Sequence, residues 1–114
     1  MSDTEERFAM RRQVEDDRIV VHVRGEIDMM VADDLHAELL DAVKQSPRTD
    51  VDFTELTFLD STGIRTFIDA RSTAQALGHH LYVVNATGMV LRVLEVTGVM
   101  SLLTVPEQPD PGSR

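Results

Sequence analysis

The sequence predicts an α/β domain with a mixed β-sheet, because strand-like and helix-like segments take turns along most of the chain. The first two strand-like segments are separated only by a tight turn, so we expect an antiparallel hairpin. The later ones are separated by helical segments, and such crossovers join parallel strands. A chain of 114 residues, 42% apolar and 27% charged, is large enough to bury one core. The expected order is β-β-α-β-α-β-α, with a short strand as an optional last element.

The predicted hairpin consists of residues 8–15 and 18–24, with a turn at the two aspartates 16–17. In its second strand, β-branched residues alternate with polar ones, which is typical of a strand buried on one face. These branched residues are Ile19, Val21 and Val23. Gly25 is expected to end the strand.

The first predicted helix covers residues 33–43. Acidic residues in its first turn and Lys44 after its last turn suit the helix dipole, and the Ser-Pro pair at 46–47 stops it. The apolar residues are spaced so that they share one helix face: Leu35, Leu39, Ala42 and Val43.

The second half of the chain repeats the alternation. A short strand is predicted at 50–53, and the stretch 54–57 after it has the composition of a turn. The second helix opens at 60–63 and ends at Gly78. The last predicted elements are a buried strand at 81–84, a third helix at 89–96 and a short final strand at 102–105.

These elements make one domain over residues 8–105. Residues 1–7 are polar and are expected to be flexible. Residues 106–114 contain three prolines and no apolar residue that would pack, so we expect a disordered tail.

The charge of the chain narrows the classes of partner. Eleven basic and 20 acidic residues give a net charge of −9. A negative field repels phosphate backbones and anionic lipid, so we expect neither direct nucleic-acid binding nor membrane binding. There is no cysteine, the longest apolar runs are too short for a membrane span, and the acidic start is unlike a signal peptide. These features together predict a cytoplasmic protein.

The residues with potential for chemistry predict neither a metal, a cofactor nor an active site. The histidines at 22, 36 and 79–80 are not spaced as metal ligands, and we interpret them as surface or capping residues. The phosphate-binding and nucleophile motifs of common enzymes are absent from the sequence. Asp52 follows a strand, where an aspartyl nucleophile can lie. Without a second nearby acid to hold magnesium, it is better interpreted as a turn carboxylate.

The segment Asp60-Ser61-Thr62-Gly63 stands out, because it comes just before a helix. Any one of its first three residues can cap the helix, and capping alone is one interpretation of the segment. Capping does not require three such residues in a row. A phosphorylated hydroxyl at this place would meet the positive end of the helix dipole and several free N–H groups. The segment is therefore a candidate for a reversible phosphorylation site.

This segment lies within residues 51–64, which resemble the signature of STAS domains, and most closely that of the anti-sigma factor antagonists. In that family a strand runs into a DSSG or DSTG sequence at the start of a helix. The other matches are the segment 23–28 followed by Ala32 and Leu35, and Gly78 with the strand 81–84, a helix and Gly98. The resemblance covers about residues 8–105.

The resemblance implies a small domain with a central mixed sheet and helices mainly on one side. It also implies a function in transcription regulation by partner switching. The unphosphorylated antagonist binds an anti-sigma factor and so frees a sigma factor. Where the anti-sigma factor is a serine-protein kinase, it phosphorylates the antagonist and ends binding, and a serine phosphatase restores it.

By position in the motif, the phosphorylation site is Ser61. The resemblance places Asp60, Thr62 and Gly63 beside it and Asp28 close by, as partner-binding residues. The resemblance predicts a kinase substrate and not an enzyme. It does not predict the oligomeric state. Two alternatives stay open. One is a STAS scaffold or a ligand-sensing module for a nucleotide or lipid in stress signalling or lipid transport. The other is an enzyme that uses Asp52 or Ser61 as nucleophile.

Overall fold

The computed structural model describes residues 7–105. The predicted tail 106–114 and residues 1–6 lie outside the described residues. Of the segment predicted to be flexible, only Arg7 is described, and its side chain pairs with Glu26 and Asp28. The elements are, in chain order, β1 (Phe8–Val14), β2 (Ile19–Ile27), α1 (Ala32–Gln45), β3 (Arg48–Leu59), α2 (Ser61–Ala76), β4 (His80–Val84), α3 (Gly88–Val96) and α4 (Met100–Leu103).

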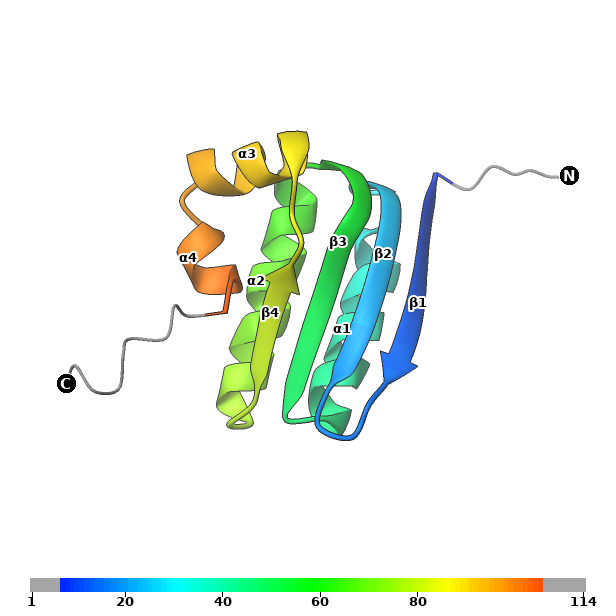
Figure 1. Cartoon of the computed structure of the whole chain (residues 1–114), viewed down its shortest axis with the longest axis vertical. Coiled ribbons are helices and arrows are strands. Elements are labelled where there is room, and N and C mark those ends of the chain that lie inside the picture. The colour runs from blue at the N-terminus through cyan, green and yellow to red at the C-terminus, as the bar shows by residue number, and fades with distance from the viewer. Residues whose placement is uncertain (1–6, 106–114) are drawn as a thin grey trace, which may run out of the picture.

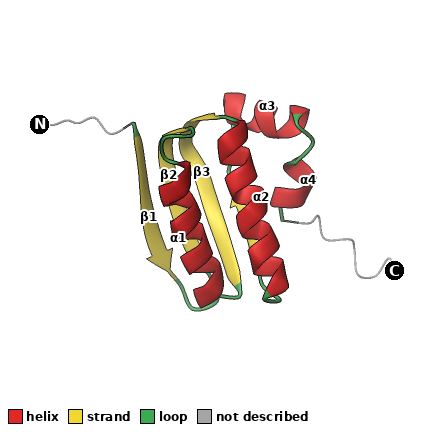
Figure 2. Ribbon diagram, turned by 180° about the vertical axis from the view of Figure 1, so that it is seen from behind, coloured by secondary structure: helices red, strands yellow, loops and turns green. Residues whose placement is uncertain are grey.

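The four strands form one mixed sheet in the order β1-β2-β3-β4. β1 is antiparallel to β2, while β2, β3 and β4 are parallel (Figure 1). Helices α1 and α2 lie side by side on one face of the sheet, and α3 lies beyond the end of the strands (Figure 2). No helix of residues 7–105 lies over the opposite face (Figure 1). The predicted α/β fold with helices mainly on one side is confirmed.

The core lies between the sheet and the two helices. Phe53 of β3 meets Phe67 of α2 edge to face, with ring centroids 5.2 Å apart. Alternate residues of the strands and the apolar face of each helix close around this pair. The fully or nearly fully buried side chains include Val21, Val23, Leu35, Leu39, Val51, Leu81 and Val83.

β3 is longer than predicted, because residues 54–57 continue the strand rather than forming a turn. Relative to β2, β3 carries one extra residue between Asp52 and Glu55 and another between Leu56 and Phe58. These bulges interrupt the alternation of buried and exposed residues, so exposed polar residues follow one another in the sequence. The same bulges are why the pattern resembled a turn.

Gly25 lies inside β2 and does not end it. Its φ of +93° and the register shift next to it mark an irregularity in the strand. A Cβ at this position would lie 2.0 Å from the carbonyl oxygen of Arg7, which accepts a 2.7 Å hydrogen bond from the amide of Glu26. Glycine is needed here because the chain entering β1 comes so close.

The final strand predicted at 102–105 is wrong. Met100–Leu103 is a short helix instead, and its Leu103 is fully buried. α4 contacts α2 and β4, so the chain covers the flank of the core here without adding a strand to the sheet (Figure 1). A short apolar run fits either element, because it has no clear period.

Candidate functional site

The candidate site lies where the parallel strands β2 and β3 end. Ile27 and Leu59, the last residues of the two strands, are register partners. The amide of Asp60 donates a hydrogen bond to the carbonyl oxygen of Ile27 over 3.2 Å. The residues that follow the strands, Asp28 and Asp60, therefore start side by side.

Asp60 is the N-cap of α2. Its backbone is extended, with φ −102° and ψ −177°, and its Oδ1 accepts a hydrogen bond from the amide of Gly63 over 2.9 Å. Its carbonyl accepts the first helical bond, from Ile64. The capping task that the sequence left open among three residues thus falls to Asp60.

Ser61 is the first residue of α2 and is exposed, whereas Thr62 is half-buried. The carbonyl of Thr62 also accepts a hydrogen bond from the hydroxyl of Thr66 within the helix. Of the two hydroxyl residues, Ser61 is the more open to a modifying enzyme. It also stands at the positive end of the helix dipole, where a dianion is tolerated.

Gly63 is buried under this surface. A Cβ there would lie 2.6 Å from Cγ2 of Ile27 and 2.6 Å from Cδ1 of Leu59. The absence of a side chain lets α2 start directly against the ends of β2 and β3. Gly63 therefore sets the position of Ser61 from below.

Asp28 is held in the loop between β2 and α1. Its Oδ1 accepts a hydrogen bond from the amide of Met30 over 2.9 Å, and its Oδ2 pairs with Nη2 of Arg7 at 3.3 Å. Arg7 also pairs with Glu26 at 2.8 Å. The side chain of Asp28 keeps 23% of its exposure, so it is both fixed and accessible.

Apolar side chains surround these carboxylates, and the sequence analysis did not single them out. Met29 and Met30 are 72% and 79% exposed, and Phe58 near the end of β3 is 41% exposed. A hollow of about 310 Å³ beside them is lined by Arg7, Phe8, Glu26, Asp28, Met30 and Val31. Uncovered apolar groups next to charges are typical of protein-binding surfaces, and methionine adapts to many partners. The adjacent methionines after a strand were the available signal.

Asp52 lies on β3 and not in a turn. Its contacts are not those of a catalytic carboxylate. Its Oδ1 accepts hydrogen bonds from the amide and hydroxyl of Thr54 and from Nδ2 of Asn85, and its Oδ2 lies 3.1 Å from Nδ1 of His22. Partial burial tends to raise the pKa of Asp52, but the bonds from Thr54 and Asn85 and the nearby His22 lower it overall. Asp52 is thus a satisfied structural carboxylate.

Two further histidines, His79 and His80, have structural contacts. Nδ1 of His79 lies 2.7 Å from the carbonyl oxygen of Val43, and His80 stacks on Tyr82. Within residues 7–105, no three His, Asp or Glu side chains converge as metal ligands would. In the same range, no helix is long and apolar enough to cross a membrane.

The fold and this site define a STAS-type regulatory domain. The sequence matches the family model described as "Mlab, STAS domain" over residues 10–104, so the chain belongs to the STAS domain family. It is 25% identical over 101 residues to the anti-sigma-B factor antagonist of Bacillus subtilis, which covers 89% of this chain and 92% of that protein.

Solved structures agree with this assignment. An anti-sigma factor antagonist from Mycobacterium paratuberculosis is 26% identical, with a TM-score of 0.73, and the match covers 93% of this chain and 89% of the other. The antagonist SpoIIAA in its unphosphorylated form is 18% identical, with a TM-score of 0.74 over 92% of each chain. The latter likeness concerns the fold alone, and the chain has the fold of the anti-sigma factor antagonists.

Proposed function

We propose that this chain is an anti-sigma factor antagonist that is switched by phosphorylation of Ser61. In the unphosphorylated form it binds an anti-sigma factor and so releases a sigma factor, which alters transcription without contact with nucleic acid. The partner is a serine kinase that phosphorylates the chain, and a serine phosphatase restores binding. The chain itself is a cytoplasmic kinase substrate and not an enzyme. Membership of the STAS family and the names of the similar proteins support this proposal.

The main observation behind the proposal is that capping and exposure fall on different residues at the start of α2. Asp60 makes the capping bond, and the neighbouring Ser61 is exposed. A serine that is not needed as the cap, at a helix start, can accept a phosphoryl group without loss of the helix. The half-buried Thr62 is the poorer acceptor.

The contact surface for the anti-sigma factor, in this proposal, surrounds Ser61. Asp28, Asp60 and Thr62 contribute polar contacts, and Gly63 supports them through its close packing on β2 and β3. Met29, Met30 and Phe58 add the exposed apolar area that a stable complex needs. The surface thus combines a small polar centre with flexible apolar side chains.

Phosphorylation would change this surface more than the fold. The phosphoryl group brings a charge of about −2 next to Asp60 and near Asp28, and it adds bulk to the contact. Burying unpaired like charges against a partner protein costs on the order of several kcal/mol. A loss of about 2.8 kcal/mol already weakens binding about a hundredfold. The helix dipole at the same place stabilises the anion by about 0.3–1 kcal/mol in the free protein.

Capture from native lysate followed by mass spectrometry tests the partner and the site together. The wild-type chain and Ser61→Ala should capture an anti-sigma factor with a kinase domain, and Ser61→Asp should lose it. Phosphate should appear on Ser61 after incubation with this kinase and ATP. Phosphate mainly on Thr62, or equal capture by Ser61→Asp, would contradict the proposed switch.

A further inference from the structure

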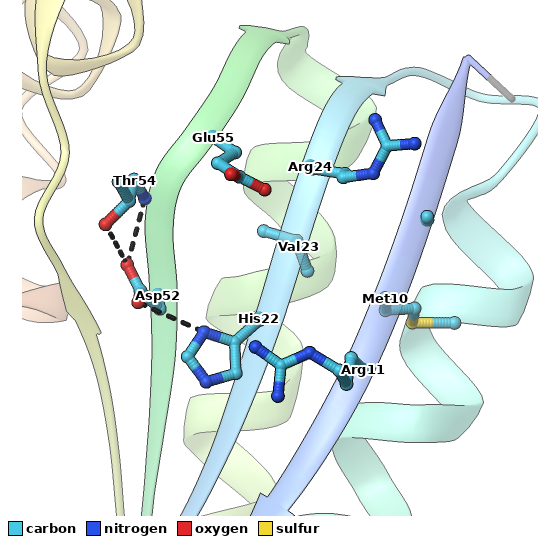
Figure 3. A pocket seen from close by; sticks show the side chains of 9 residues that line it. Met10, Arg11, His22, Val23, Arg24, Asp52, Thr54 and Glu55 are labelled. Carbon is cyan, nitrogen blue, oxygen red and sulfur yellow. Dashed lines mark hydrogen bonds and ion pairs between the residues drawn. The ribbon is translucent and has the colours of Figure 1, made fainter. Parts of the chain in front are cut away.

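A second surface lies on the sheet face that no helix of the described part of the chain covers (Figure 1). A hollow of about 410 Å³ opens there between β1, β2 and β3. Figure 3 shows Arg11 on β1 and His22 and Arg24 on β2, with Asp52, Thr54 and Glu55 on the neighbouring β3; Arg24 extends toward β1 and Arg11 toward His22. The hollow shares none of its lining residues with the surface around Ser61.

The cations of this hollow differ from their neighbours on the same face. Arg18 and Arg48 both pair with Asp50, at 2.7 Å and 2.9 Å. Arg11 and Arg24 form no ion pair with any carboxylate among residues 7–105. Other basic residues of the described range, such as Arg65 and Arg71, are unpaired too, but Arg11 and Arg24 both line this hollow.

The strand register explains why these arginines border an open space. Arg11 lies opposite His22, and the next position on this face pairs Ala9 with Arg24. The small side chain of Ala9 leaves the surface beside Arg24 open. Figure 3 shows the guanidinium group of Arg11 directed across β2 toward His22, so an anion over Ala9 would contact Arg24 directly and Arg11 after a change of its side-chain rotamer.

The wall formed by β3 has a different chemistry. The carboxylate of Asp52 already has Thr54, Asn85 and His22 as partners. Glu55 is exposed, and like the arginines it has no ion-pair partner within the described part of the chain. The carboxylate of Glu55 can accept hydrogen bonds from a hydroxyl group. This side of the hollow therefore favours a ligand with hydrogen-bond donors at the end away from its anionic group.

We propose that this hollow binds a small hydroxylated organic anion. Its carboxylate or phosphate group lies over Ala9 between Arg11 and Arg24, and its hydroxyl groups reach toward Glu55. Guanidinium groups bind such anions through paired, charge-assisted hydrogen bonds. The hollow has the size of a small-molecule site. This proposal is independent of the role of Ser61.

Titration of the full chain, followed by amide NMR shifts, tests the proposal. Glycerol 3-phosphate serves as the hydroxylated phosphate and malate as the hydroxylated carboxylate, with glycerol as the uncharged control. At least one anion should shift the amides of Ala9, Arg24 and Glu55 in a saturable way, while glycerol should not. Comparison of the two anions identifies the preferred group.

The matched variants are Arg11→Gln with Arg24→Gln in one protein and, as control, Arg65→Gln on the exposed side of α2. Each lost charge-assisted contact should weaken binding about tenfold or more. The double variant should therefore bind at least about a hundredfold more weakly, and the control should bind as the wild type does. The proposal is overturned if neither anion shifts these amides, or if the control loses as much affinity as the double variant.

Discussion

Asp60 accepts a hydrogen bond from the amide of Gly63 over 2.9 Å, and this bond makes Asp60 the cap of α2 in place of its neighbour Ser61. The relationship separates two tasks that adjacent residues often share. Asp60 holds the helix start, which leaves the exposed Ser61 available as the proposed phosphorylation site. The stability of the domain and the state of the proposed switch are therefore expected to respond to different substitutions.

Removal of the cap should lower stability, and removal of the proposed acceptor should not. We expect Asp60→Ala to lower the free energy of unfolding by about 1 kcal/mol, because the amide of Gly63 loses its partner. Ser61→Ala should change it by less than about 0.5 kcal/mol. Urea unfolding measures both. Equal losses in the two variants would show that Ser61 shares the capping task.

Gly63→Ala should destabilise the domain even though alanine favours helices. The new methyl group would lie 2.6 Å from Ile27 and from Leu59, so either α2 or the strand ends must move. Overpacking of this kind costs about 1–3 kcal/mol, against a helix-propensity gain of about 1 kcal/mol. Ser72→Ala, at an exposed position of α2, is the control and should be neutral or stabilising. A more stable Gly63→Ala protein would contradict the close packing.

The hydrogen bonds of Asp52 predict a dependence of stability on pH. They lower its pKa in the folded state, so Asp52 stabilises the fold fully above the ordinary aspartate pKa of about 3.9. This contribution is lost as the pH falls through the lowered pKa. The stability difference between wild type and Asp52→Asn should therefore be largest near neutral pH and shrink below about pH 4. A difference that grows on acidification would contradict this sign.

The exposed methionines should matter for binding and not for folding. Met29→Ser with Met30→Ser should leave the melting temperature nearly unchanged, because both side chains are mostly exposed. Affinity for the anti-sigma partner should fall about tenfold or more, since each loses apolar contact area. Val14→Ser, on the exposed part of β1 away from Ser61, is the control. Unchanged affinity in the methionine variant would show that the contact surface lies elsewhere on the domain.

The sequence predicted the elements whose apolar residues keep a regular period. The alternation of Ile19, Val21 and Val23 and the spacing of Leu35 and Leu39 each correspond to one buried face. The prediction was wrong where that period breaks. The bulges of β3 break the alternation of buried and exposed residues, so half of this strand was not predicted. Gly25 was predicted to end β2, but it lies inside the strand where the backbone of Arg7 comes close.

The site was predicted only in part, for a related reason. The segment 60–63 is local in sequence, so its place before a helix was visible without a structure. The hydrogen bond between Asp60 and Ile27, and the pairing of Ala9 with Arg24 across β1 and β2, join residues far apart in the chain. Such pairs depend on strand register, which the sequence pattern alone did not determine.

The most direct test of the account is calorimetric titration of the captured anti-sigma factor with the unphosphorylated chain and with the chain phosphorylated on Ser61. Circular dichroism of both forms should show the same fold and a similar melting temperature. We predict that phosphorylation weakens binding about a hundredfold or more. Equal affinity of the two correctly folded forms would contradict the phosphorylation switch at Ser61.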